Sequence, residues 1–150
     1  MKVVVVDKIH KQYHDHVIFD DFSMEIEQGS FVAIQGASGS GKSTLLNMIG
    51  LLDSPDKGNI VIFDKKNVKP FSRQANKLLK AKIGYLFQNF ALIDNKSVYY
   101  NLYLSIDHFS FPDKKERILK ALEDVGLKGF ENKKTVSYTH LRAHETRGNL

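Results

Sequence analysis

The chain has 150 residues, of which 42% are hydrophobic, and it carries a formal net charge of +5 at pH 7. This apolar content is sufficient for one domain with a hydrophobic core, and it excludes an intrinsically disordered chain. The sequence lacks cysteine, which excludes disulfides and thiolate metal sites, and no stretch approaches the length of a membrane span. The lysines are scattered among acidic residues, so the net charge indicates a solvated surface rather than a nucleic-acid-binding patch.

The first part of the chain is predicted to be mainly β. Residues 3–9 form an apolar run that is typical of a strand. Residues 17–26 mix apolar and polar residues, which is consistent with the second strand of a hairpin that ends at Gln28 and Gly29. The short apolar run at residues 31–34 is predicted to be a buried strand.

A glycine-rich loop follows this run and is the most informative motif of the chain. Residues 36–44 fit the pattern G-x-x-x-x-G-K-[ST], in which glycines let successive N–H groups turn toward an anion. The Lys42 ammonium is predicted to reach the terminal phosphates of a nucleotide, and the Ser43 hydroxyl to ligate Mg²⁺. A flexible Gly/Ser turn is the alternative, but it does not explain a lysine followed by a serine. The predicted phosphate-binding residues are Gly36, Ala37, Ser38, Gly39, Ser40, Gly41, Lys42, Ser43 and Thr44.

Helices and strands alternate in the next part of the chain. A helix predicted from about residue 43 to 52 adds the positive end of its dipole to the loop. A turn-rich stretch then leads into a predicted strand at residues 59–63. Ser72 is predicted to cap a helix that runs to about residue 81, and residues 83–87 are predicted to form a strand buried in a mostly parallel sheet. This alternation favours an α/β fold.

Two helical segments are predicted beyond residue 88. Residues 97–106 and 113–125 both show apolar residues at helical spacing. In the second segment, Asp113 and Glu116 are predicted to form a capping box, and Gly126 is predicted to end the helix. We therefore expect a helical subdomain in this part of the chain.

Residues 136–150 differ in composition from the preceding chain. They contain Arg142 and Arg147 and no lysine, whereas the chain up to residue 134 contains 18 lysines and two arginines. Residues 136–146 also resemble the in-frame translation of a transposase adapter used in sequencing libraries. We therefore expect the natural reading frame to stop near Thr135 and residues 136–150 to be an assembly artefact, with a natural polar tail as the alternative.

Three positions outside the loop fall where one class of phosphate-loop protein has functional residues. Over residues 1–134 the chain resembles the nucleotide-binding subunit of an ATP-binding-cassette (ABC) transporter. Tyr13 lies where that family has an aromatic residue that stacks on adenine, and a tyrosine packed on the core is the alternative. Gln88 ends an apolar stretch similar to the family's Q-loop, although a lone glutamine is usually a solvated loop residue. Asn101 lies in a segment where the family commonly has Glu-Asn, which supports the resemblance.

The resemblance extends to a subgroup within this family. Residues 36–47 and 51–58 look similar to the ABC proteins that export lipoproteins, macrolides and antimicrobial peptides. Ala37 replaces the more usual proline, which changes the stiffness of the loop but removes no phosphate donor. Residues 84–98 are most similar to bacteriocin exporters of the lactococcin 972 type.

The resemblance implies a fold, a set of cofactors and partners. The expected fold is a phosphate-loop ABC ATPase core at residues 1–88, with an N-terminal antiparallel β subdomain, followed by part of a helical subdomain at residues 89–135. ATP and Mg²⁺ are the implied cofactors, with Lys42 and Gln88 as catalytic residues and Ser43 and Gln88 as metal ligands. Two copies would sandwich two ATP molecules and drive a transmembrane permease, which would hold the subunit in the cytoplasm at the inner face of the cell membrane. No nucleic-acid partner is expected.

Several elements of the family are not identified downstream of Gln88. These are the Leu-Ser-Gly-Gly-Gln signature, the Walker B aspartate, the catalytic glutamate and the switch histidine, so we expect the C-terminal half of the domain to be missing. We therefore expect this chain to bind ATP without hydrolysing it. Two alternatives stay open: a non-transporter ABC ATPase that acts in DNA repair or translation, and a different phosphate-loop enzyme such as a small-molecule kinase.

Overall fold

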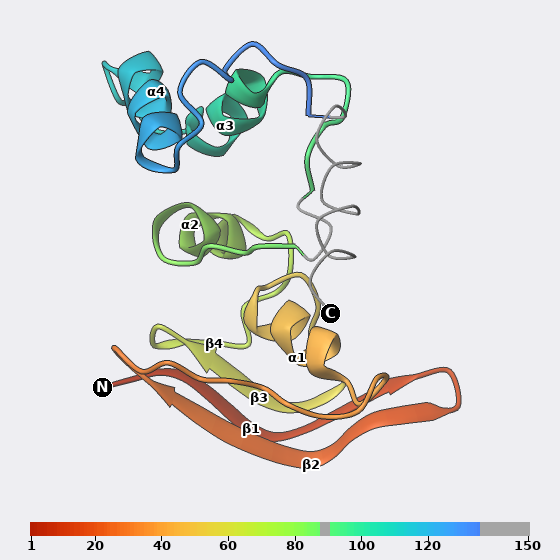
Figure 1. Cartoon of the computed structure of the whole chain (residues 1–150). Helices are drawn as coiled ribbons and strands as arrows, with labels where there is room; N and C mark the ends of the chain where they lie inside the picture. Colours follow the sequence, from red (N-terminus) through yellow and green to blue (C-terminus); the bar gives the residue numbers. More distant parts are fainter. Residues whose placement is uncertain (88–90, 136–150) are drawn as a thin grey trace. The chain divides into compact units, whose positions relative to one another are not determined.

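The computed structural model describes residues 1–87 and 91–135, and the chain divides into two compact units, Met1–Tyr85 and Leu86–Leu150. Among the described residues, the first unit contains a four-stranded sheet and two helices, and the second contains two further helices (Figure 1). Gln88, which the sequence assigns to the Q-loop, and residues 136–150, which it assigns to an artefactual tail, lie outside the described residues.

The sheet has the strand order β2-β1-β3-β4, and each pairing that the structure describes is antiparallel. The predicted hairpin is confirmed: it supplies β1 (Lys2–Tyr13) and β2 (His16–Glu27), which are both longer than expected. β3 (Lys57–Ile62) pairs with the other side of β1, and the short β4 (Lys65–Lys66) pairs with β3. β1 is therefore an inner strand, and its last residue is Tyr13.

An irregularity in β1 changes which of its side chains face the core. Val4 and Val6 are buried, and the register with β2 then shifts between Val6 and Ile9. Lys8 lies in this shift with a φ of 44°. Because an extra residue reverses the alternation of a strand, Ile9 and Lys11 continue on the buried face. The irregularity therefore sends the side chain of Lys11 into the protein.

Gly58 of β3 lies against this irregularity. A Cβ atom at Gly58 would lie 2.3 Å from the carbonyl oxygen of Lys8 and 2.7 Å from that of Asp7. No side chain larger than hydrogen fits there without moving the backbone of β1. The glycine therefore allows β3 to follow the irregular part of its neighbour.

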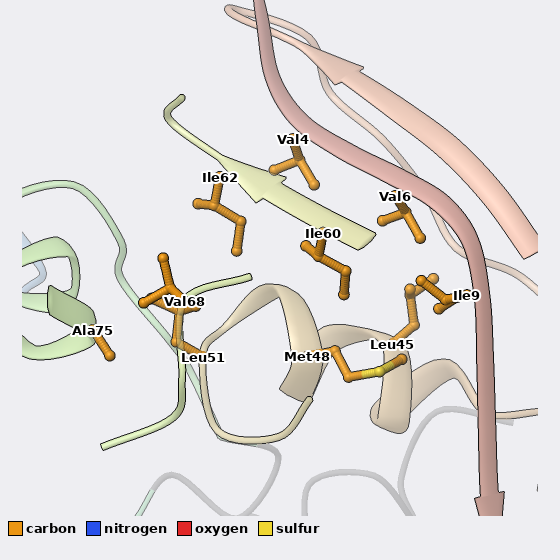
Figure 2. Close-up of a cluster of buried hydrophobic side chains, with 10 residues drawn as sticks. All are labelled: Val4, Val6, Ile9, Leu45, Met48, Leu51, Ile60, Ile62, Val68 and Ala75. Atoms are coloured by element: carbon orange, nitrogen blue, oxygen red, sulfur yellow. The ribbon is translucent and has the colours of Figure 1, made fainter. Parts of the chain in front are cut away.

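The hydrophobic core lies between the sheet and α1 (Lys42–Ile49), as Figure 2 shows. β1 and β3 contribute valine and isoleucine side chains, and α2 (Arg73–Ala81) adds an alanine. Burial of each large apolar side chain contributes about 1.5–3 kcal/mol relative to its exposure to water. The buried cluster consists of Val4, Val6, Ile9, Leu45, Met48, Leu51, Ile60, Ile62, Val68 and Ala75.

The chain reverses direction at the end of α1. The helix ends at Ile49 rather than near residue 52, because Leu51 takes the left-handed conformation with a φ of 59°. The Leu51 N–H donates to the Met48 carbonyl at 3.2 Å, and the Leu52 N–H donates to the Asn47 carbonyl at 2.8 Å. This pair of hydrogen bonds is a common helix stop. It directs residues 53–56 back toward β1.

Two predicted helix starts are confirmed by their capping hydrogen bonds. The Ser72 hydroxyl accepts from the Ala75 N–H at 3.1 Å at the start of α2. In the second unit, the Ser97 hydroxyl accepts from the Tyr100 N–H at 3.1 Å at the start of α3 (Val98–Ile106). A serine at this position satisfies a backbone donor that the helix itself leaves unpaired.

The predicted capping box at the start of α4 (Lys114–Asp124) is wrong. Asp113 occupies the N-cap position, but its carboxylate makes no capping hydrogen bond there. It instead accepts from Nε of Arg117 at 2.9 Å, because a guanidinium one turn away offers a stronger, charge-assisted partner than a backbone amide. The predicted stop is confirmed, since the helix ends just before Gly126, whose N–H donates to the Glu123 carbonyl at 3.0 Å.

Two predicted strands are not formed in the described part of the chain. Residues 31–34 and residues 83–87 lack strand structure, and Phe31 and Leu86 are 96% and 83% exposed. An apolar run becomes a strand only when a neighbouring strand accepts its backbone hydrogen bonds, and the sheet described above ends at β2 and β4. Ile83 instead packs against the buried cluster, and the Tyr85 hydroxyl donates to Oδ1 of Asn47 in α1 at 2.6 Å.

Candidate functional site

The glycine-rich loop at residues 36–44 leads directly into α1. Gly39 and Gly41 have φ angles of 81° and 86°, in the left-handed region that glycine adopts most readily. Gly41 is the N-cap of α1, and a Cβ there would lie 2.5 Å from Cγ2 of Ile18 and 2.9 Å from Cζ of Phe19. The loop therefore rests on β2 through a position where only glycine fits.

The Lys42 side chain folds back over the loop. Its Nζ donates to the Gly36 carbonyl at 2.9 Å and to the Ala37 carbonyl at 2.7 Å, and it lies 3.5 Å from the Ser40 hydroxyl. These contacts hold the ammonium over residues 36–40. A positive charge in this position can pair with an anion that the same loop encloses.

The backbone at the start of α1 offers further donors. The first helical hydrogen bond runs from the Leu45 N–H to the Gly41 carbonyl at 2.9 Å, so the amides of Lys42, Ser43 and Thr44 precede it. Such amides, together with the positive end of the helix dipole, favour a negative ligand. Ser43 is exposed in this first turn, where its hydroxyl is accessible to a cation bound beside phosphate.

Tyr13 lies at the end of β1 and is 43% exposed. Its hydroxyl donates to Oδ2 of Asp53, in the segment that follows α1. The Nζ of Lys11 lies 4.8 Å from the centroid of the Tyr13 ring. The hydrogen bond to Asp53, together with burial, raises the pKa of Tyr13, and an interaction with the Thr44 side chain acts in the opposite direction. Tyr13 is therefore an exposed aromatic ring with a fixed hydroxyl, near the first turn of α1.

Lys11 and Asp53 form a charged pair in which the lysine is buried. The Lys11 side chain is only 8% exposed, and its Nζ donates to Oδ1 of Asp53 at 2.9 Å and to the Ser54 carbonyl at 2.8 Å. Burial alone lowers the pKa of Lys11, but the hydrogen bond to Asp53 and its charge outweigh this effect and raise it. Burial alone raises the pKa of Asp53, but hydrogen bonds from Tyr13 and Lys11 outweigh it and lower it.

Asn101 of α3 holds a backbone segment of the second unit. Its Oδ1 accepts from the Ile93 N–H at 2.7 Å, and its Nδ2 donates to the carbonyls of Ile93 at 3.2 Å and Ser97 at 3.0 Å. The Thr135 hydroxyl adds a hydrogen bond to the Ile93 carbonyl at 3.0 Å. The structural role of Asn101 is therefore to fix the segment between residue 91 and α3.

Sequence reasoning missed Lys11 and Asp53. The turn at residues 53–58 was expected, but its attachment to β1 was not. The sequence does carry one signal, because Lys11 and Tyr13 alternate with Gln12 and so share a face of the strand. Which face that is depends on the irregularity at Lys8, and the sequence alone does not reveal it.

A match to a family model over most of the chain identifies the family. A sequence model of the family described as "ABC transporter" matches residues 19–143. The chain belongs to the ABC transporter family.

Individual relatives agree with this assignment. The chain is 39% identical over 126 residues to "Sulfate/thiosulfate import ATP-binding protein CysA" of Mesostigma viride, covering 83% of this chain and 34% of that protein. It is 34% identical over 134 residues to "Macrolide export ATP-binding/permease protein MacB" of Aggregatibacter actinomycetemcomitans, covering 85% of this chain and 21% of that protein. The chain therefore spans about a third or less of the length of these relatives.

A solved structure supports the fold. The chain resembles the ATP-binding cassette MJ0796 in a dimeric, post-hydrolysis state bound to ADP and Pi, with a TM-score of 0.76 and 32% identity. The match covers 87% of this chain and 61% of that one. The expected ABC ATPase fold, with its N-terminal antiparallel sheet, is thus confirmed. Within residues 1–87 and 91–135, no helix is long and apolar enough to cross a membrane.

Proposed function

We propose that this chain binds ATP together with Mg²⁺ through the loop at residues 36–44. The observation that carries the proposal is the arrangement of Lys42 over that loop at the N-terminus of α1. Lys42 and the amides of residues 39–44 would hold the phosphates. Mg²⁺ would neutralise phosphate charge there, with Ser43 as one ligand and Gln88 as a second.

Tyr13 is proposed as the residue that stacks on adenine. Its ring is partly exposed, and its hydroxyl interacts with Asp53 and lies near Thr44 of the phosphate motif. An aromatic face binds a base without requiring a particular hydrogen-bond pattern. This geometry supports a nucleotide that extends from the phosphate loop toward the end of β1.

For hydrolysis, Lys42 and Gln88 are the proposed catalytic residues, with Gln88 orienting the attacking water. The signature sequence, the Walker B aspartate and the catalytic glutamate are not identified downstream of Gln88. We therefore propose that the 150-residue chain binds ATP without turnover. The activity of a complete subunit would also require a second copy, since each ATP would lie between two subunits.

We also propose that the complete protein is the ATP-binding subunit of an exporter. Within the exporters, we propose bacteriocin export of the lactococcin 972 type. The partner would be a transmembrane permease, which would hold the subunit at the cytoplasmic face of the membrane. The names of the relatives include both import and export proteins, so the proposed direction of transport rests on residues 36–47, 51–58 and 84–98. A permease gene next to the complete gene supports transport, whereas its absence favours a non-transporter ABC protein that acts in DNA repair or translation.

Calorimetry with MgATP tests the binding proposal. We expect the 150-residue chain to bind, and Lys42→Ala to weaken binding by about tenfold or more, as loss of a charged hydrogen bond of roughly 1.5–3 kcal/mol implies. Lys80→Ala in α2 is the matched control, because it removes an exposed lysine away from the loop. A folded chain without affinity for MgATP would refute the proposal. If the chain hydrolyses ATP and Lys42→Ala abolishes that hydrolysis, the proposed lack of turnover is refuted.

A further inference from the structure

The end of β1 is attached to residues 53–56 by a set of polar contacts. Lys11 donates to Asp53 and to the Ser54 carbonyl, as described above. The Gln12 N–H donates to Oδ2 of Asp56 at 2.8 Å, and the Asp56 N–H donates to the His10 carbonyl at 2.9 Å. These contacts bind both the side chains and the backbone of residues 53–56 to the strand.

Within this set of contacts, Asp53 is the residue that binds the Tyr13 hydroxyl. One carboxylate oxygen accepts from the Tyr13 hydroxyl, and the other accepts from Lys11, whose ammonium also lies over the same ring. A tyrosine ring that is held at its hydroxyl and contacted on its face by a cation has little freedom to turn. With 43% of the residue exposed, a planar base can still reach the ring.

Asp53 is also connected to the phosphate loop. α1 starts at that loop and has 8 residues, and the chain returns to β1 through Asp53 after the turn at Leu51. At the other end of α1, Gly41 lies so close to Ile18 and Phe19 of β2 that a Cβ atom would clash with them. One short helix and one turn therefore connect the loop to the residue that holds the Tyr13 hydroxyl.

We propose that Asp53 is a positioning residue for nucleotide binding, which orients the Tyr13 ring for the base through its contacts with Tyr13 and Lys11. This proposal rests on the proposed function, in which the loop binds the phosphates and Tyr13 stacks on adenine. The proposal is specific, because the Asp53 carboxylate is expected to affect binding of the base and not binding of the phosphates.

The test compares ATP with inorganic tripolyphosphate, each with Mg²⁺, by calorimetry on the 150-residue chain. We expect Asp53→Asn and Tyr13→Phe each to weaken ATP binding by about three- to tenfold, the equivalent of one lost hydrogen bond, with tripolyphosphate binding unchanged. Tyr13→Phe keeps the ring and the Lys11–Asp53 pair, so it is informative even if Asp53→Asn folds poorly. The double variant should bind ATP no more weakly than the weaker single variant, because both changes remove the same contact.

Asp56→Asn is the matched control. Asp56 lies in the same turn, accepts from the Gln12 N–H and lies 3.8 Å from Nζ of Lys11, but in the described structure no hydrogen bond joins it to the Tyr13 hydroxyl. We expect it to leave the ratio of ATP to tripolyphosphate affinity at the wild-type value. A purely structural role of Asp53 would lower both affinities together, or would be mimicked by Asp56→Asn, and either result overturns the proposal. The proposal is also overturned if Tyr13→Phe keeps the wild-type ratio of ATP to tripolyphosphate affinity.

Tyr13→Ala separates this proposal from the proposed function. It should weaken ATP binding by about 5- to 150-fold if the ring stacks on the base. If Tyr13→Ala has no effect, or if the wild-type chain binds neither ligand, the proposed function itself fails. If Tyr13→Ala weakens ATP binding while Asp53→Asn and Tyr13→Phe do not, the proposed function stands and the role of Asp53 is refuted.

Discussion

At the scale of single residues, the ion pair between the buried Lys11 and the partly exposed Asp53 makes the stability of the first unit depend on pH. The pKa of Asp53 is lowered in the folded protein, with hydrogen bonds from Tyr13 and Lys11 outweighing the effect of burial. A carboxylate with a lowered pKa stabilises the fold at pH values above its ordinary range, and that stabilisation is lost as the pH falls through the folded-state pKa. Lys11, whose pKa is raised, stays charged across this acidic range.

We therefore expect Asp53→Asn to lower the free energy of unfolding by about 1–3 kcal/mol at neutral pH. The difference from the wild type should shrink toward zero in acid, where the wild-type carboxylate is protonated as well. Urea unfolding at pH 7 and in strongly acidic buffer measures this difference in the free energy of unfolding. Glu25→Gln, which removes a half-exposed partner of Lys2, is the control and should change little at either pH. A difference that is equal at both pH values would contradict the prediction.

A second prediction at this scale concerns Asn101. Its side chain makes three hydrogen bonds to the backbone, and Asn101→Ala leaves those groups on Ile93 and Ser97 to find other partners. We expect the Ile93 amide to exchange with solvent markedly faster, and the second unit to lose about 1–3 kcal/mol of stability. Hydrogen exchange read at Ile93 measures the effect. Asn132→Ala, at an exposed asparagine, should leave that amide unchanged.

At the scale of elements, the irregular part of β1 depends on Gly58 in β3. Gly58→Ala places a Cβ against the carbonyl oxygen of Lys8 and also forces alanine into a φ of 84°. Gly29→Ala is a matched control, because Gly29 has a φ of 79° but open space around it. We expect Gly29→Ala to cost about 1–2 kcal/mol from the backbone alone. Gly58→Ala should cost clearly more in urea unfolding, and equal costs would refute the clash.

The sequence was sufficient for the elements whose causes are local. The hairpin, the glycine-rich loop before α1, the Ser72 cap of α2 and the stop at Gly126 each depend on a few neighbouring residues. The strands expected at residues 31–34 and 83–87 depend instead on neighbouring strands, so apolar content alone predicted them wrongly. The position of Lys11 depends on the irregularity at Lys8, and the side chain of Asp113 had two competing partners. For the candidate site, the loop and Tyr13 were named from the sequence and their roles stay predictions, whereas the contact of Tyr13 with Asp53 required the fold.

At the scale of the whole molecule, large apolar side chains remain exposed in the described part of the chain. Phe31 is 96% exposed and Phe71 is 77% exposed. We expect the 150-residue chain to self-associate as its concentration rises, which light scattering would detect. Phe31→Ser should reduce the scattering and leave the urea midpoint unchanged, since the side chain packs little. Leu45→Ser, at a buried position, should instead lower the midpoint, and an equal effect of both variants would contradict the prediction.

The two ends of α1 lie beside different strands of one hairpin. Gly41 lies against side chains of β2 at the start of the helix, and residues 53–56, which follow its end, are hydrogen-bonded to β1. Because Asp53 follows α1 and accepts from the Tyr13 hydroxyl, a shift of α1 would also act on the Tyr13 ring. In the proposed function, binding of the phosphates and stacking on the base are therefore coupled through this helix.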